Sequence, residues 1–505
     1  MSKFRGVIAC VAMLALAAPL LSDAASAQTV PGREGGVRAP RGGGGHGWRG
    51  GGAIGLGLGL LGAAIAAGAA ARSQGDGPPP RRVHPPRRPV IVEDEAPPPR
   101  RMHRPRRPVV VEEAPPPRRP RQVFRLAAPA ARMLPPPAGE KRFAPDEILV
   151  QFRDGGDAKA PENFARRQKL QLVQSRQLSL IGKTIVRYRV ADGRDLRAVL
   201  RRAARDTTVA SVQPDYVYAL QQEANTMQPP PEQPPAAPMS YVGGALNLPL
   251  AHAIATGKGV RVAVIDSSVD LDHPELAGAV AESFDALPND RAGPHAHGTG
   301  MAGAIAGRKK LDGAAPQAQL LAVRSFGDKG DSTRAVTLDI VAGLDWAAGK
   351  GARIVNMSFA GPADPLLAEM IAAAAKKKMI LIAAAGNEGP NAPPQYPAAY
   401  PQTIAVSAVN DRAELYDRAN RGAYVAFAAP GVEVLAAAPK GAYDFSTGTS
   451  IACAEVSGIA ALLLERRPDL DGDAMRALLR RTSRKLSADV GAGEVDALAA
   501  LKSEE

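Results

Sequence analysis

Three short segments carry side chains that could act together in nucleophilic catalysis. Asp266 follows the apolar run Val260–Ile265, His297 lies in HAHGTGMAGAIAG, and Ser450 lies in STGTSIACAEVSG. A serine hydroxyl is a weak nucleophile unless a base takes its proton, and an imidazole has a suitable pKa for that base. A carboxylate on the other ring nitrogen fixes the tautomer and stabilises the imidazolium. Together the three residue types predict acyl transfer.

Each motif alone also has a purely structural explanation. An aspartate after a strand can cap a turn, His297 would suit the first turn of a helix, and Ser450 would suit an ordinary helix N-cap. Asn387 in AAAGN, taken alone, would be a turn residue. The order Asp, His, Ser is one of the few in which catalytic triads occur, so the combination is far more specific than its parts.

The elements that must position these residues lie in residues 241–505, where short apolar runs alternate with helical stretches. The apolar runs are Val260–Ile265, Gln319–Val323, Ile354–Met357, Met379–Ala384 and Thr403–Ala408. Helical stretches such as Thr333–Ala348 and Pro365–Lys378 lie between them. This alternation is typical of a parallel sheet covered by helices on both faces. Such sheets place active-site groups beyond the carboxyl ends of strands, where Asp266 falls.

With these motifs in place, residues 241–482 resemble a subtilisin-type serine peptidase of the subtilase family. The resemblance implies an α/β fold, a three-layer parallel sheet flanked by helices, and serine endopeptidase activity on protein or peptide substrates. It assigns the triad to Asp266, His297 and Ser450. It also assigns a side-chain donor for the oxyanion to Asn387, beside the backbone N–H of Ser450.

The same resemblance implies residues that bind the substrate. The segment ending at Ser358 is similar to the family's strand before the cleft, so Ser358, Phe359, Ala360 and Gly361 would lie along an extended substrate backbone. Glu388 is expected at the rim of the primary side-chain pocket, where it would favour basic side chains. The alternative for Glu388 is a solvated rim carboxylate.

Residues 141–220 predict a small α+β domain. Its expected strands are Glu147–Phe152, Thr184–Val190 and Val212–Leu220, and its expected helices are Asn163–Lys169 and Leu196–Arg205, the second capped by Asp195. The ending VASVQPDYVYAL is similar to the end of the family's propeptide. The resemblance implies that this domain folds the peptidase, inhibits it as an intramolecular partner, and is then removed. We expect the chain to cut itself within the Pro/Gln linker of residues 221–240.

Residues 1–27 predict a secretory signal peptide, because Lys3 and Arg5 precede an apolar run and small residues precede Gln28. The alternative is an uncleaved membrane anchor. A cleaved signal implies export to the periplasm, the cell envelope or the medium.

Residues 28–140 predict a low-complexity arm. The formal net charge of +13 lies in residues 1–138, which hold 21 Lys and Arg against 8 Asp and Glu, so the neutral remainder implies no specific nucleic-acid-binding fold. Residues 53–71 carry no charge, and both membrane association and a flexible linker remain open for them. Residues 78–138 hold 19 of the 46 prolines, which predicts a polyproline-II spacer. Weak contact of residues 51–138 with a membrane or a polyanion is the functional alternative.

No cofactor or metal site is expected. Cys10 lies in the signal peptide, so Cys453 alone allows neither a disulfide within the mature chain nor a cysteine-based zinc site. Glu275 matches a calcium-ligand position of the family, but the short basic loop GRKKLDGAAP lacks the residues that bind the family's main calcium. His295 and His297 would form a His-x-His metal pair without an evident third ligand.

The chain departs from the usual family pattern at four positions near these motifs: Ser268, Gly300, Ala454 and Glu455. The first two donate no catalytic group. Ala454 replaces a usual proline one turn after Ser450, which could change the direction of the Ser450 side chain. These departures motivate a rival hypothesis, a non-catalytic peptide-binding scaffold. Cys453 is expected to be a buried structural thiol, with a redox switch as the alternative.

Overall fold

The computed structural model describes residues 136–155, 157–221, 240–290, 293–329, 332–486 and 490–503. The predicted signal peptide, nearly all of the arm and most of the linker lie outside these ranges and stay predictions. Within the described ranges, no helix is both long and apolar enough to cross a bilayer.

The larger part of the described chain is built on a seven-stranded parallel sheet in the order β14-β13-β12-β10-β5-β7-β6. The strands are β5 (Arg261–Asp266), β6 (Val280–Asp285), β7 (Gln319–Arg324), β10 (Ile354–Met357), β12 (Ile380–Ala384), β13 (Thr403–Val409) and β14 (Val425–Pro430). The central strands are buried on both faces, which is why their sequences are continuously apolar rather than alternating. The parallel sheet predicted from these runs is therefore present.

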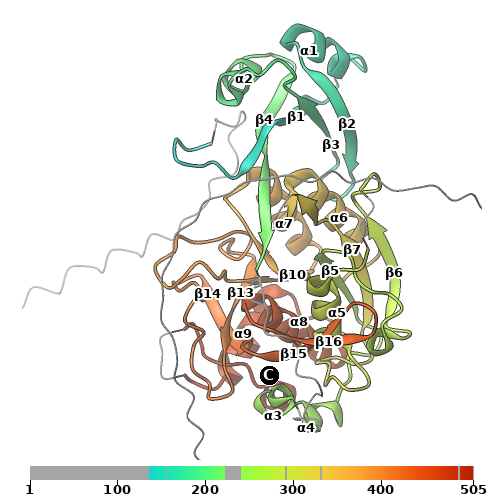
Figure 1. The fold of residues 1–505 in the computed structure, drawn as a ribbon, viewed down its shortest axis with the longest axis vertical. Helices are drawn as coiled ribbons and strands as arrows, with labels where there is room; N and C mark the ends of the chain where they lie inside the picture. The colour runs from blue at the N-terminus through green and yellow to red at the C-terminus, as the bar shows by residue number, and fades with distance from the viewer. Residues whose placement is uncertain are drawn as a thin grey trace, which may run out of the picture. The chain divides into compact units, whose positions relative to one another are not determined.

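Helices cover both faces of this sheet (Figure 1). One face packs on α5 (Ala296–Ala306), α8 (Thr449–Arg466), α9 (Gly472–Thr482) and α10 (Ala497–Lys502). The other face packs on α6 (Thr337–Gly349) and α7 (Pro365–Lys376). Alternate residues of β5 serve the two layers: Val262 and Val264 pack toward α8, while Ala263 and Ile265 pack toward α6.

Short elements complete this domain. They are α3 (Tyr241–Ala245), α4 (Leu248–His252), the 3-10 helix η1 (Pro274–Leu276), the strands β8 (Gly327–Lys329), β9 (Ser332–Val336) and β11 (Phe359–Ala360), and the hairpin β15 (Val434–Ala438) and β16 (Ala442–Ser446).

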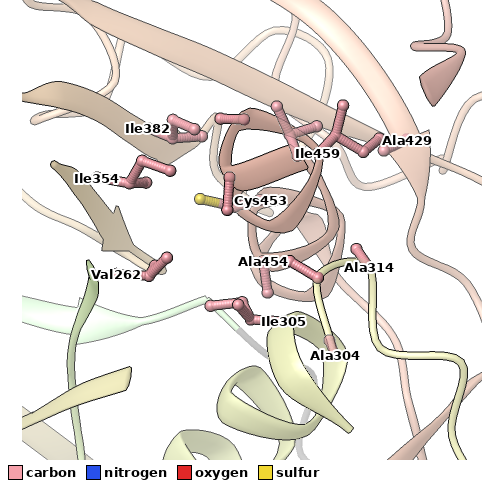
Figure 2. Packing of buried hydrophobic residues seen from close by; sticks show 14 of the residues in the cluster. Val262, Ala304, Ile305, Ala314, Ile354, Ile382, Ala429, Cys453, Ala454 and Ile459 are labelled. Atoms are coloured by element: carbon pink, nitrogen blue, oxygen red, sulfur yellow. The ribbon is translucent and has the colours of Figure 1, made fainter. Parts of the chain in front are cut away.

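Helix α8, whose first turn carries the predicted nucleophile, is buried along most of its length. Every residue of α8 from Thr449 to Leu464 is buried. Figure 2 shows Ala454 on the side of α8 that faces Ile305 of α5 and Ala314. Helix α8 runs without a break through Ala454, so the alanine gives a regular helix where the family's proline would remove an N–H donor.

Residues 143–220 form a small α+β domain, as their sequence predicts. Its antiparallel sheet has the order β2-β3-β1-β4. The elements are β1 (Phe143–Phe152), α1 (Ala160–Gln168), β2 (Gln171–Leu178), β3 (Lys183–Arg189), α2 (Leu196–Ala203) and β4 (Val209–Leu220). Asp195 caps α2, because its carboxylate accepts a hydrogen bond of 2.8 Å from the N–H of Ala198. Helix α2 ends at Ala203, two residues earlier than predicted.

Strand β4 is long and pairs with strands of both domains, so that one seven-stranded sheet extends from the small domain into the larger one (Figure 1). Its first half pairs with β1 in the small domain. Its second half lies between β9 and β11 of the larger domain and is antiparallel to both. The end of β4 thus pairs with strands of the larger domain.

Candidate active site

The four predicted catalytic residues lie at the carboxyl ends of the parallel strands. Asp266 is the last residue of β5, and Asn387 follows β12 by three residues. His297 lies in the first turn of α5 and Ser450 in the first turn of α8. Four segments that are far apart in the sequence thus meet at one edge of the sheet, where open α/β sheets bind ligands.

Asp266, His297 and Ser450 form a hydrogen-bonded chain. His297 Nδ1 lies 2.7 Å from Asp266 Oδ1, and His297 Nε2 lies 3.1 Å from Ser450 Oγ. The three side chains are at most 1% exposed. A carboxylate accepts hydrogen bonds, so Nδ1 carries the proton and Nε2 is free to take the proton of Ser450.

Asn387 is held with its amide NH2 directed at a main-chain carbonyl. Its Oδ1 accepts hydrogen bonds of 3.0 Å from both the N–H and the hydroxyl of Thr449. Its Nδ2 therefore points the other way and lies 2.8 Å from the carbonyl oxygen of Gln221. Ser450 Oγ contacts the same oxygen. A carbonyl between a serine hydroxyl and an amide donor is placed for attack and for stabilisation of the resulting oxyanion.

Gly448 makes this close approach possible, and sequence reasoning did not single it out. Its φ of 150° lies in a region that side chains rarely adopt. A Cβ at this position would lie 2.6 Å from the carbonyl oxygen of Gln221 and 2.7 Å from Asn387 Nδ2. The glycine before Thr449 in STGTSIACAEVSG was the available signal.

The predicted substrate segment, Ser358 to Gly361, runs beside the end of β4. The N–H of Gln221 lies 3.3 Å from the carbonyl of Ser358, and Phe359 and Ala360 pair with Leu220 and Ala219. The Ser358 hydroxyl has another role, because it donates a hydrogen bond of 2.9 Å to the carbonyl of Ser450.

Tyr218, three residues before Gln221, fills a buried space beside Gly361. A Cβ on Gly361 would lie 2.4 Å from the Tyr218 ring, so the space exists because position 361 has no side chain. The ring of Phe359 meets Tyr218 edge to face at 5.8 Å. The Tyr218 hydroxyl lies 3.3 Å from Oδ2 of the buried Asp364 and 3.2 Å from the carbonyl of Pro362.

Glu388 is exposed, and its carboxylate accepts a hydrogen bond of 2.7 Å from Gln395 Nε2. Gln395 in turn accepts from Arg142 of the small domain at 2.8 Å. The carboxylate of Glu388 therefore binds Gln395. The side chain of Gln221 binds elsewhere, because its Oε1 accepts a hydrogen bond of 2.9 Å from the N–H of Asn387. The predicted effect of Glu388 on basic substrates stays a prediction.

The thiol of Cys453 is enclosed beside the nucleophile. Burial raises the pKa of this thiol to about 12, and Sγ donates to Asn356 Oδ1 at 3.2 Å. A protonated, buried thiol is a poor nucleophile, which favours the structural reading of Cys453 over the redox switch.

The residues around Glu275 do not fit a calcium ion, although Glu275 itself matches a calcium-ligand position of the family. Oε1 accepts from the N–H of Lys310 at 2.6 Å and from the Tyr443 hydroxyl at 2.7 Å. Oε2 accepts from the N–H groups of Arg308 and Lys309 at 2.8 and 2.7 Å. Calcium needs six to eight oxygen ligands, whereas this loop presents N–H donors and cationic side chains to the carboxylate.

No group of three or more His, Cys, Asp and Glu side chains in the described ranges is arranged to hold a metal ion. The ring nitrogens of His297 face Asp266 and Ser450, so His297 and His295 do not form the His-x-His metal pair considered above.

Comparison with known proteins identifies the class to which this fold and site belong. A profile of the subtilase family matches residues 257–497. Thermitase of Thermoactinomyces vulgaris is 32% identical over 264 residues, which are 51% of this chain and 92% of thermitase. Subtilisin E of Bacillus subtilis (strain 168) is 34% identical over 260 residues, 49% of this chain and 67% of that protein.

A solved structure supports the fold. Fervidolysin of Fervidobacterium pennivorans, described as a keratinolytic enzyme related to subtilisin, aligns with a TM-score of 0.62 at 23% identity. The alignment covers 74% of this chain and 63% of fervidolysin. The fold is thus subtilisin-like. The protein is a serine-type endopeptidase. It belongs to the subtilase family.

Proposed function

We propose that this subtilase is exported as an inactive precursor and cuts its own chain between Gln221 and Gln222. The observation that carries the proposal is the carbonyl of Gln221, which lies against Ser450 Oγ and 2.8 Å from Asn387 Nδ2. The chain thus occupies its own cleft as a substrate would, with β4 as the segment before the scissile bond. Export is supported by the signal peptide that residues 1–27 predict.

The mechanism assigns one role to each residue. Ser450 Oγ adds to the carbonyl carbon of the scissile peptide while His297 Nε2 takes its proton. Asp266 holds the tautomer of His297 and stabilises the imidazolium. Asn387, with the N–H of Ser450, binds the oxyanion. The carbon–nitrogen bond then breaks, His297 returns the proton to the leaving amine, and water hydrolyses the acyl-enzyme by the same steps.

Residues 141–220 serve in this proposal as a propeptide that inhibits the peptidase. Contacts outside the cleft support this role, because the small domain binds the amino ends of two helices. Asp215 Oδ1 accepts from the N–H of Leu338 in α6 at 3.2 Å, and Gln213 Oε1 accepts from the N–H of Leu366 in α7 at 3.1 Å. Helix amino ends favour carboxylates and other acceptors. A single cut at Gln221 is therefore not enough to release the propeptide, because these contacts remain.

Labelling with a fluorophosphonate probe, with mass spectrometry of the cleavage site, tests this function. We expect wild-type protein to be cut after Gln221 and, once residues up to 221 are removed, to react with the probe. Ser450→Ala should remain joined at Gln221 and unlabelled. As a control, a trace of mature wild-type enzyme is added to Ser450→Ala. Cutting after Gln221 in that mixture would show that the bond remains cleavable and that the variant alone lacks the activity to cut it. Equal processing of both proteins by themselves would refute self-cleavage.

We also propose that the peptidase needs no calcium at Glu275, because backbone N–H groups take the place of the cation. Burial acts to raise the pKa of Glu275, but the N–H groups of Lys310 and Lys309, the Tyr443 hydroxyl and the N–H of Arg308 outweigh it, and the pKa lies below the ordinary value of 4.5. This stabilisation is therefore present above pH 4.5 and is lost as the pH falls through the lower pKa of the folded state.

We expect Glu275→Gln to lower the free energy of unfolding by about 3 kcal/mol at pH 7, because charge-assisted hydrogen bonds contribute about 1.5–3 kcal/mol each and an N–H donor would face the amide. Denaturant unfolding is measured in the Ser450→Ala background to avoid autolysis. A chelator should leave the midpoint of the parent protein unchanged. A large drop with chelator, restored by calcium, would contradict the proposal.

A further inference from the structure

The imidazole of His295 caps the helix that carries the catalytic base. The N–H of His297 donates a hydrogen bond of 3.1 Å to His295 Nδ1. The carbonyl of His295 accepts from the N–H and the hydroxyl of Thr299 at 3.2 and 2.8 Å. The N–H of His295 donates to the carbonyl of Ser268, two residues after Asp266, at 2.9 Å. His295 therefore joins the start of α5 to the end of β5.

These contacts determine the protonation state of His295. A backbone N–H is always a donor, so Nδ1 must accept and the ring proton must lie on Nε2. Nε2 lies 3.3 Å from Thr333 Oγ1, whose hydroxyl donates to Asp328 Oδ1 at 2.8 Å. Thr333 belongs to β9, the strand that pairs with the second half of β4. Neutral His295 thus connects one edge of the substrate cleft to the base.

Ser267 lies between His295 Nδ1 and the carboxylate that orients His297, and its one hydroxyl proton is available to either acceptor. Ser267 Oγ lies 3.1 Å from His295 Nδ1 and 3.1 Å from Asp266 Oδ1, and it accepts from the N–H of Gly298 at 3.1 Å. Asp266 Oδ1 also receives His297 Nδ1. Within the described ranges, Asp266 Oδ2 is buried without a hydrogen-bond partner. The orientation of this carboxylate therefore depends on the side where Ser267 and His297 lie.

We propose that His295, while neutral, is a positioning residue that holds His297 and Asp266 for the reaction, and that its protonation releases them. This inference rests on the triad mechanism proposed above. A proton on Nδ1 would face the N–H of His297, so two donors would meet and the cap would be lost. The charge would also lie beside the imidazolium that forms on His297 during attack, and like charges repel.

Burial is the main reason that His295 stays neutral at neutral pH. Burial and then the neighbouring His297 lower the pKa of His295 below its ordinary value of 6.5, while Asp266 and Asp328 act to raise it. A His whose pKa is lowered in the folded protein loses its neutral form only as the pH falls below that value. The positioning should therefore be complete at neutral pH and fail in acid.

The test compares His295→Asn and His295→Ala with wild type, using mature enzyme, one peptide substrate and active sites counted by fluorophosphonate labelling. An asparagine Oδ1 can cap α5 but does not titrate, whereas alanine provides no acceptor. We expect His295→Ala to lose about tenfold in kcat with KM changed less than about threefold, because loss of a cap costs about 1 kcal/mol or more. His295→Asn should recover most of that loss.

The pH profile of kcat/KM separates positioning from general stability. The acid limb of wild type should fall more steeply than a one-proton curve, and that of His295→Asn should follow one proton. In addition, nitrogen-15 spectra of the Ser450→Ala precursor should contain the signal of a histidine protonated on Nε2, and this signal should be absent after the further change His295→Asn. Superimposable acid limbs, or an alanine variant with the kcat of wild type, would overturn the proposal. Wild type that neither labels nor hydrolyses peptides would instead overturn the triad mechanism.

Discussion

Replacing Asp266 with asparagine should lower kcat by about 10⁴-fold near neutral pH, the size of the loss that this change causes in another serine peptidase. The carboxylate is fully buried, and its Oδ1 accepts from His297 Nδ1 at 2.7 Å and from the N–H of Ser267 at 2.7 Å. An amide of the same shape carries no charge to stabilise the imidazolium, and water cannot replace it at a buried position. KM should change little, because the carboxylate does not touch β4.

A matched control is available four residues further along the chain. Asp270 is also nearly buried, and its Oδ2 accepts from the N–H of Lys440 at 2.7 Å. Asp270→Asn therefore makes the same chemical change near the site without touching the triad, and we expect its kcat to stay within a few-fold of wild type. Both variants are measured after removal of the propeptide, with active sites titrated. An Asp266→Asn enzyme within tenfold of wild type would refute the assigned role.

Asn387→Leu should lower kcat by about 10²–10³-fold with KM changed less than about threefold. That range comes from removal of an oxyanion donor in a subtilisin. Leucine has nearly the shape of asparagine but cannot donate to the oxygen that Nδ2 approaches at 2.8 Å. The loss falls on kcat because the donor gains most from the charge that develops on the oxygen during attack.

Thr449→Val tests whether orientation of the amide matters. This change removes the hydroxyl that donates to Asn387 Oδ1 and accepts from the N–H of Gly386 at 3.2 Å, but it leaves the N–H of Thr449 that donates to Asn387 Oδ1. We expect kcat to fall less than tenfold, since the hydrogen bond from the hydroxyl to the amide contributes about 1 kcal/mol. A rise in KM for Asn387→Leu at unchanged kcat would mean that Asn387 binds the ground state only.

The fold was predictable where burial is reflected in the sequence. Strands such as β12 and β13 are buried on both faces and therefore consist of continuous apolar residues. Strand β2 was missed because seven of its eight residues are exposed or only partly buried, which leaves no apolar alternation to recognise. Its existence depends on pairing with β3, a contact that local sequence does not encode.

The residues of the candidate site likewise fall into those that the sequence predicted and those that it did not. The triad types were recognisable because the chemistry requires them within short motifs. The partners of Glu388 and Glu275 were not, because they come from distant segments. Gln395 joins Glu388 to Arg142 of the small domain, and Tyr443 reaches Glu275 across 168 positions of sequence. Such contacts are set by tertiary packing, which a single sequence specifies only as a whole.

The position of β4 between β9 and β11 has a consequence for the cleavage of folded protein substrates. If β4 leaves with the propeptide as proposed, both neighbouring strands present unpaired main-chain groups, and a substrate must supply a fully extended segment of about the same length to pair with both. A segment held in a helix or a tight turn cannot do so until it opens. We therefore expect the rate at which a folded substrate is degraded to follow the free energy of its local unfolding more closely than the amino acids around its cleavage site.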